Sequence, residues 1–438
     1  MTIEHGTGTA AGPAARPRGR NVRWVIIAVI TVLAVIAYLD RGNLSVAAPL
    51  IRRDLHISNT TMGVVLSAFV WPYAIMNLPS GWAVDRFGAK ALMAVAAALW
   101  SVLAVGTGLA RNVVAFIALR VGLGVAEAPL FPAALKATDA WFPDREKAAA
   151  TGVYIAGTQA GLAIAPPIAT ALMVAFGWPA MFVIMGAVGL LALAAWLVVY
   201  RHPDRHPWLS TAERDYIAAG KVSRTEPAAA DAVTARSWLG LFRYGSVWAM
   251  IIGAFCLQYV FWFYITWLPS YLESAQHFAI GKAGFLAAVP YVAGGVAVIL
   301  GGRLSDRLIA RGLAPLAARR YVIAGGALLT TVALVITAFS AGPVLAMVML
   351  TVGMFTYSLT SGTFWTLATE VVRTSRLVGS VGSIQNFGGF LGGACAPIAT
   401  GVLVDASGGF TLALTAAAVL CLVSAALYGL VLRHRLPV

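Results

Sequence analysis

Long apolar segments alternate with short polar loops along the whole chain. A helix needs about 20 apolar residues to cross the roughly 30 Å hydrocarbon core of a bilayer, and hydropathy separates twelve such segments. They lie at about 23–47, 61–84, 90–109, 113–137, 148–173, 179–200, 243–271, 283–304, 320–340, 344–368, 378–403 and 411–432. The pattern predicts an all-α integral membrane protein with twelve transmembrane helices, and it excludes an ordinary soluble protein.

Composition and charge agree with a membrane protein. Of 438 residues, 60% are hydrophobic and only 11% are charged, whereas about a quarter of a soluble domain is charged. The net charge of +14 would indicate nucleic-acid binding in a soluble chain. Here most of the lysines and arginines lie in alternate loops, which is typical of the cytoplasmic side of a membrane. We therefore expect no nucleic-acid partner and both termini in the cytoplasm.

The longest polar stretch, 201–236, falls between the sixth and seventh segments and ends in the linker-like sequence 226–232. It predicts five parts of the chain: a cytoplasmic tail over 1–22, a six-helix lobe over 23–200, a central loop over 201–242, a second six-helix lobe over 243–432 and a tail over 433–438. The lobes repeat in sequence, since Gly81-Trp-Ala-Val-Asp85-Arg86 after the second segment corresponds to Gly302-Arg-Leu-Ser-Asp306-Arg307 after the eighth. Parallel repeats of six spans are typical of a two-lobed secondary transporter whose substrate binds between the lobes.

The loop motif within 81–90, Gly81-x-x-x-Asp85-Arg86-x-Gly88-x-Lys90, resembles the signature between helices two and three of the major facilitator superfamily. The segments 38–44, 119–132 and 141–146 resemble the anion:cation symporters within it, a group that includes bacterial galactonate, glucarate and hexuronate transporters and, more distantly, sialin and the vesicular glutamate transporters. The resemblance covers nearly the whole chain. It implies the major facilitator fold and transport of an organic anion.

Four ionisable side chains fall within the predicted helices: Asp40, Arg41, Arg120 and Glu127. Each costs roughly 2.5 to 3.5 kcal/mol or more in hydrocarbon, so each needs a partner, a cavity or a proton path. Arg120 and Glu127 are two helical turns apart and project from one face, whereas the neighbours Asp40 and Arg41 point about 100° apart. One of that neighbouring pair can face the substrate while the other faces the fourth segment.

The chemistry of these four residues predicts proton coupling. Two acids balanced between burial and nearby guanidinium groups can load and release protons, and the two arginines stay cationic and attract a carboxylate. The resemblance implies that Asp40 and Glu127 carry protons, that Arg41 holds the substrate carboxylate and that Arg120 links substrate to proton site. The alternative is that Arg120 and Glu127 only form a buried ion pair that ties helices together.

The second lobe has no counterpart to these charges, because the repeat places Thr351 opposite Arg120 and Ser358 opposite Glu127. We therefore expect it to supply neutral hydrogen bonds and aromatic surface, which suit a hydroxylated substrate. The candidate substrate-binding residues besides the arginines are Tyr38, Asn43, Tyr73, Thr158, Gln159, Tyr264, Trp267, Thr363, Trp365 and Asn386. Thr158 departs from the glutamine expected in galactonate-type relatives, which leaves the sugar acid open. A single aromatic ring can equally face lipid.

The repeated loop pairs, Asp85 with Arg86 and Asp306 with Arg307, are candidate gating residues that hold the cytoplasmic side shut in an outward-facing state. The alternative is a solvated loop that only fixes topology. The histidines lie outside the predicted helices and the three cysteines lie within apolar segments, so we expect neither a metal site nor a cofactor.

Together these features predict a proton-coupled symporter in a bacterial inner membrane. It would act as a monomer and import an organic anion. The favoured substrates are sugar acids: a hexonate, hexarate or hexuronate. Alternatives are an importer of aromatic or dicarboxylate anions and an exporter of the same fold. A membrane-embedded enzyme or a channel is disfavoured, since no nucleophile–base or metal cluster falls at membrane depth and a channel does not need titratable acids there.

Overall fold

The computed structural model describes residues 21–220, 235–340, 342–372, 377–432 and 436. Both predicted tails, apart from residues 21, 22 and 436, and the linker at 226–232 lie outside these residues. All described secondary structure is helical, and eleven helical stretches are long and apolar enough to cross a membrane. The longest, α7 (Asp144–Val199), contains two crossings, because Gly177 interrupts it with φ 82° and ψ 160°. The chain is therefore an all-α, multi-pass membrane protein, with predicted segments five and six merged into α7.

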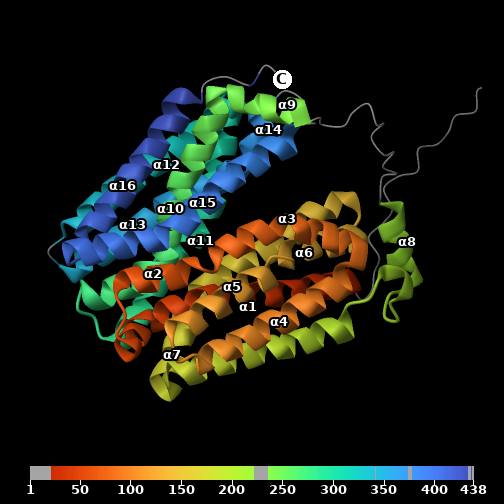
Figure 1. The fold of residues 1–438 in the computed structure, drawn as a ribbon. Coiled ribbons are helices and arrows are strands. Elements are labelled where there is room, and N and C mark those ends of the chain that lie inside the picture. Colours follow the sequence, from red (N-terminus) through yellow and green to blue (C-terminus); the bar gives the residue numbers. More distant parts are fainter. Residues whose placement is uncertain (1–20, 221–234, 341, 373–376, 433–435, 437–438) are drawn as a thin grey trace, which may run out of the picture.

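Figure 1 shows two bundles side by side. The first lobe contains α1 (Val22–Leu55), α2 (Asn59–Ser67), α3 (Val70–Phe87), α4 (Ala89–Leu109), α5 (Val113–Glu127), α6 (Leu130–Trp141) and α7. The second lobe contains α10 (Gly245–Ser274), α11 (Ile280–Ala310), α12 (Pro315–Ala338), α13 (Pro343–Thr366), α14 (Ala368–Val371), α15 (Val378–Ser407), α16 (Thr411–Ala426) and the π-helical turn η5 (Leu427–Val431). We call the end at which α1 begins and η5 ends the terminal end and the opposite end the distal end.

In two of the predicted membrane segments the helical hydrogen bonding is interrupted, although the backbone there keeps helical dihedral angles. The second divides into α2 and α3 at residues 68–69, and the fourth divides into α5 and α6 at residues 128–129. Proline causes such breaks because it lacks an N–H group and its ring clashes with the carbonyl of the residue four positions earlier. Pro72 and Pro132 stand four residues after Ala68 and Ala128. Glu127 consequently ends α5 at the break.

The lobes meet from mid-depth to the distal end. Asp405 of α15 accepts hydrogen bonds from the backbone and side chains of Asn59 and Thr60 at the start of α2, at 2.6–3.1 Å. Gly401 lies so close to α2 that a Cβ there would be 2.4 Å from the Asn59 carbonyl oxygen. Among the interlobe hydrogen bonds, the one farthest from the distal end joins the Ser67 hydroxyl to a carbonyl of α15, at 2.5 Å. On the terminal side of that level, no hydrogen bond or ion pair joins the lobes between described residues.

The central loop is more than a linker. Its helix α8 (Thr211–Ala219) packs on the terminal end of the first lobe, where the buried Glu213 accepts hydrogen bonds from the backbone N–H groups of Val22 and Arg23. Arg23 also forms ion pairs with Glu213 at 2.8 Å and with Glu146 of α7 at 3.2 Å. Composition alone did not predict this contact, because a nine-residue amphipathic helix has little hydropathy signal.

Candidate anion and proton site

The four ionisable residues predicted for membrane depth lie together in the first lobe. Asp40 and Arg41 come from the middle of α1, and Arg120 and Glu127 come from α5; all four are buried. Close packing of α1 on α7 fixes the position of the first two, since a Cβ at Gly42 would be 2.8 Å from Ala165 of α7. The four residues are thus brought together in one buried cluster, and its role as an anion and proton site stays a prediction.

Arg41 is the centre of the cluster. Its Nε donates a hydrogen bond to Glu127 Oε2 at 3.1 Å, and the two side chains are 6% and 0% exposed. Its guanidinium group lies over the rings of Tyr38, Phe69 and Tyr73, with distances to the ring centroids of 4.4, 5.1 and 4.7 Å. Aromatic faces attract a cation, more strongly once it is removed from water. The rings therefore hold the guanidinium group beside Glu127.

The other two charged residues have weaker partners. Arg120 Nη1 donates to the backbone carbonyl of Asp40 at 3.4 Å, and Asn43 Nδ2 donates to Asp40 Oδ1 at 3.1 Å. The described residues contain no ion pair between Arg120 and Glu127. Glu127 is therefore paired with Arg41, and not with Arg120 as in the alternative that the sequence spacing allowed.

Five buried polar atoms in this cluster have no hydrogen-bond partner among the described residues. They are Asp40 Oδ2, Arg41 Nη2, Asn43 Oδ1, Arg120 Nε and Glu127 Oε1. Buried polar groups are nearly always hydrogen-bonded, since an unpaired group costs about 1–3 kcal/mol. Two free cationic donors beside two free carboxylate oxygens form a set that can receive a carboxylate ligand and a proton.

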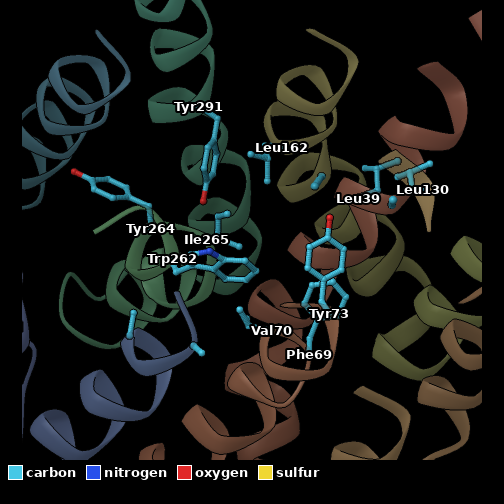
Figure 2. Close-up of a cluster of buried hydrophobic side chains, with 14 of the residues drawn as sticks. Leu39, Phe69, Val70, Tyr73, Leu130, Leu162, Trp262, Tyr264, Ile265 and Tyr291 are labelled. Atoms are coloured by element: carbon cyan, nitrogen blue, oxygen red, sulfur yellow. The ribbon is translucent and has the colours of Figure 1, made fainter. Parts of the chain in front are cut away.

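The second-lobe wall approaches this cluster through aromatic side chains. Tyr73 packs on Phe390 of α15, with centroids 5.7 Å apart, and Phe69 packs on Trp262 of α10 at 6.4 Å. In Figure 2, the ring of Tyr291 from α11 faces Leu162 of α7. The hydroxyl end of Tyr291 points towards Trp262, which lies near Val70. The hydroxyl of Tyr291 forms no hydrogen bond with any described residue.

The other neutral candidates divide into two groups. Tyr264 and Trp267 are fully buried within the second lobe and bonded there, to the carbonyls of Leu350 at 3.0 Å and Pro397 at 3.1 Å. The Thr158 and Thr363 hydroxyls bond to carbonyls of their own helices, at 2.7 and 2.8 Å. Three candidates keep side-chain polar groups without a bond to described residues: Gln159, Trp365 and Asn386.

Sequence reasoning missed three second-lobe residues. Gln258 of α10 accepts a hydrogen bond from Tyr357 of α13 at 2.7 Å, and Tyr357 stacks on Phe261. Gly389 of α15 packs directly against Gln258, where a Cβ would be 2.9 Å from Cγ. The first two missed residues are thus Gln258 and Tyr357, and the third is Tyr291. A lone glutamine or tyrosine within an apolar segment gives no periodic signal, so only the packing identifies these residues.

The predicted gating residues lie at the terminal end and do not join the lobes here. Asp85 pairs with Lys136 of the same lobe at 2.6 Å, and Arg86 lies over the rings of Trp82 and Phe87. Asp306 and Arg307 are exposed.

Comparison with known proteins identifies relatives across nearly the whole chain. The chain is 33% identical to the probable L-galactonate transporter of Escherichia coli (strain K12), which covers 91% of this chain and 86% of the relative. It is 33% identical to the probable sulfoacetate transporter of Cupriavidus necator, over 90% of each chain. It is 30% identical to the probable galactarate/D-glucarate transporter of Bacillus subtilis (strain 168), over 91% of this chain and 90% of the relative.

The fold has solved counterparts. A bacterial homolog of the human lysosomal transporter Spinster, in an inward-facing and unoccupied conformation, superposes with a TM-score of 0.80 at 19% identity and covers 96% of this chain and 100% of its own. The sequence profile described as Major Facilitator Superfamily matches residues 30–397. The chain therefore belongs to the major facilitator superfamily.

Proposed function

We propose that the protein is a proton-coupled symporter that imports an organic anion of the sugar-acid class, a hexonate, hexarate or hexuronate. The observation that carries this proposal is the set of unpartnered polar atoms on Asp40, Arg41, Arg120 and Glu127, at mid-depth beside the lobe interface. The relatives that transport galactonate, galactarate or glucarate support the substrate class. The anion, protons and the bilayer would be the partners, and a monomer would suffice.

Arg41 and Arg120 bind the carboxylate in this proposal. Each keeps a buried guanidinium N–H without an acceptor, at Nη2 and Nε respectively. A guanidinium group stays charged at all physiological pH values and forms directed hydrogen bonds to a carboxylate. The rings around Arg41 would hold it in one orientation, which lowers the entropy lost when the anion binds.

Glu127 and Asp40 carry the protons. A charged Glu127 competes with a substrate carboxylate for Arg41, because both are anions that accept from the same guanidinium group. Protonation of Glu127 removes this competition and frees Arg41 for the anion. Release of the anion into the cell, followed by loss of the proton, restores the ion pair and completes the cycle.

The second lobe recognises the substrate hydroxyl groups. Tyr291 and Asn386 present polar groups from two helices, Gln258 offers its amide nitrogen while its oxygen is bonded to Tyr357, and Trp262 supplies a flat apolar surface. Tyr264 and Trp267 take no direct part, because their polar atoms are bonded within the lobe. Recognition by hydrogen bonds discriminates strongly against analogues that lack a hydroxyl, since buried partners would then remain unpaired.

Alternating access follows from the interlobe contacts. With the terminal end in the cytoplasm of a bacterial cell and the protein in the inner membrane, the distal contacts close the outer side in this conformation. Asp85, Arg86, Asp306 and Arg307 would then close the inner side in the opposite conformation. Rocking of the lobes exchanges one set of contacts for the other.

Reconstituted transport tests the proposal. Purified protein in proteoliposomes is supplied with D-galactonate, D-glucarate, D-glucuronate or sulfoacetate, with and without an imposed proton gradient. We expect accumulation of at least one sugar acid only when the outer side is more acidic. Preferential uptake of sulfoacetate, or of an aromatic or dicarboxylate anion, would replace the substrate class, and net export would reverse the direction. Accumulation independent of pH would contradict proton coupling.

A further inference from the structure

A second concentration of charge lies at the distal end of the molecule. A cavity of about 370 Å³ opens there between the end of α1 and the end of α10. Its lining is strongly polar and comprises Pro49, Arg52, Arg53, Glu273, Ser274 and His277. The cavity is separate from the Arg41–Glu127 cluster, because Arg52 and Arg53 stand three helical turns further along α1.

The two arginines of this cavity differ in their partners. Arg53 forms an ion pair with Glu273, which links α1 of the first lobe to α10 of the second. The Arg52 side chain forms no hydrogen bond with a described residue, and its buried Nε has no acceptor among them. The cavity therefore contains one paired and one unpaired guanidinium group.

The charges of Asp405 and Glu273 act on Arg52, but no described carboxylate forms a hydrogen bond or an ion pair with its guanidinium group. Asp405 lies near it, but the two Asp405 oxygens already accept four hydrogen bonds from Asn59 and Thr60. Glu273 is bonded to Arg53. An anion that enters the cavity would find a half-buried cation with an unused donor, and such a group gains more from an anion than a fully hydrated one does.

The Arg53–Glu273 pair is also open to competition. The Arg53 side chain is 61% exposed and that of Glu273 is 13% exposed. Ion pairs near the surface contribute little to stability, so a carboxylate at high concentration can displace Glu273 from Arg53. Displacement would remove one of the contacts that close the distal end.

We propose that Arg52 and Arg53 form a second, outer anion-binding site that captures an organic carboxylate before it reaches the central cluster, and that the captured carboxylate competes with Glu273 for Arg53. This inference rests on the proposed function in two respects: the class of the anion, and the placement of the distal end on the outer side of the membrane. Capture loosens the distal contact, so arrival of the anion favours opening of the outer side.

A binding experiment separates the two sites. Full-length protein carrying Arg41→Ala, which lacks the central anion ligand, is titrated with D-galactonate by ligand-observed NMR. We expect a weak, saturable component that Arg52→Ala abolishes in this background. Lys282→Ala is the matched control, because Lys282 is an exposed cation at the same end that does not line the cavity. No remaining component, or one that Arg52→Ala leaves unchanged, would overturn the proposal.

Transport kinetics provide a second measurement that leaves the central site intact. Electrostatic capture raises the rate of encounter and is weakened by salt. We expect Arg52→Ala to raise the KM for outside D-galactonate by about fivefold at low ionic strength with little change in kcat, and Lys282→Ala to have less effect. Equal effects of the two variants would contradict a specific site. If the proposed function itself is wrong, wild-type protein shows no Arg41-dependent binding of D-galactonate. If only the outer site is wrong, that binding remains and the Arg52-dependent component is absent.

Discussion

Arg41 of α1 and Glu127 of α5 form a buried ion pair, with Nε 3.1 Å from Oε2, in the middle of the first lobe. Each side chain also keeps one polar atom without a partner in the described part of the chain, Nη2 on Arg41 and Oε1 on Glu127. Replacement of a buried ion pair by apolar packing is often neutral or stabilising, so retention of this one with spare hydrogen-bonding capacity favours a role in function over one in stability.

Glu127→Gln tests proton coupling. The glutamine carbonyl can still accept from Arg41, but the side chain cannot exchange a proton and resembles the protonated acid permanently. We expect the variant to bind the anion and to exchange labelled for unlabelled anion across proteoliposomes. We also expect it to lose accumulation driven by an acidic outer side. Full pH-driven accumulation by Glu127→Gln would contradict the role of this acid.

Arg41→Ala tests the anion ligand. The change removes the central cation and leaves Glu127 buried without its partner, which costs about 3–5 kcal/mol when the acid stays charged. We expect loss of high-affinity anion binding and a lower midpoint of thermal unfolding. Adding Glu127→Gln should restore thermal stability but not anion binding. Micromolar affinity retained in either variant would place the carboxylate ligand elsewhere.

Tyr291→Phe and Tyr264→Phe form a matched pair, because each removes one hydroxyl from a buried second-lobe tyrosine. The Tyr291 hydroxyl has no partner among described residues, whereas that of Tyr264 donates to Leu350. We expect Tyr291→Phe to raise the KM for a hydroxylated anion about fivefold, the equivalent of one hydrogen bond of about 1 kcal/mol. Tyr264→Phe should instead lower thermal stability with little change in KM. The reverse pattern would exchange their roles.

Gly401→Leu tests closure of the distal end. A Cβ at Gly401 would be 2.4 Å from the Asn59 carbonyl oxygen of the other lobe, so a leucine there prevents the close approach of α15 and α2. We expect a population shifted towards the outward-open conformation, measured as increased labelling of cysteines introduced at the distal interface. Gly295→Leu is the control, since a Cβ at Gly295 meets nothing within 4 Å. Unchanged labelling in Gly401→Leu would show that closure does not need this contact.

Much of the architecture follows from the sequence alone. Twelve apolar segments are readable because each must fill the thickness of a bilayer, and the superfamily is identifiable from its loop motifs. Asp40, Arg41, Arg120 and Glu127 stand out for the same reason, since charge at membrane depth is costly. Segments five and six merge into α7 in the structure, because hydropathy reports burial in lipid and not the helical geometry around Gly177.

Tertiary structure alone decided how these residues are paired. Helical periodicity orients side chains within one helix but does not determine which neighbour each helix meets, so it could not select Arg41 as the partner of Glu127. The same limit applies to the contact of α8 with Arg23, to the polar groups of Tyr291 and Gln258, and to the cavity at Arg52. Each depends on segments far apart in the chain, and their proximity results from packing, which no local pattern encodes.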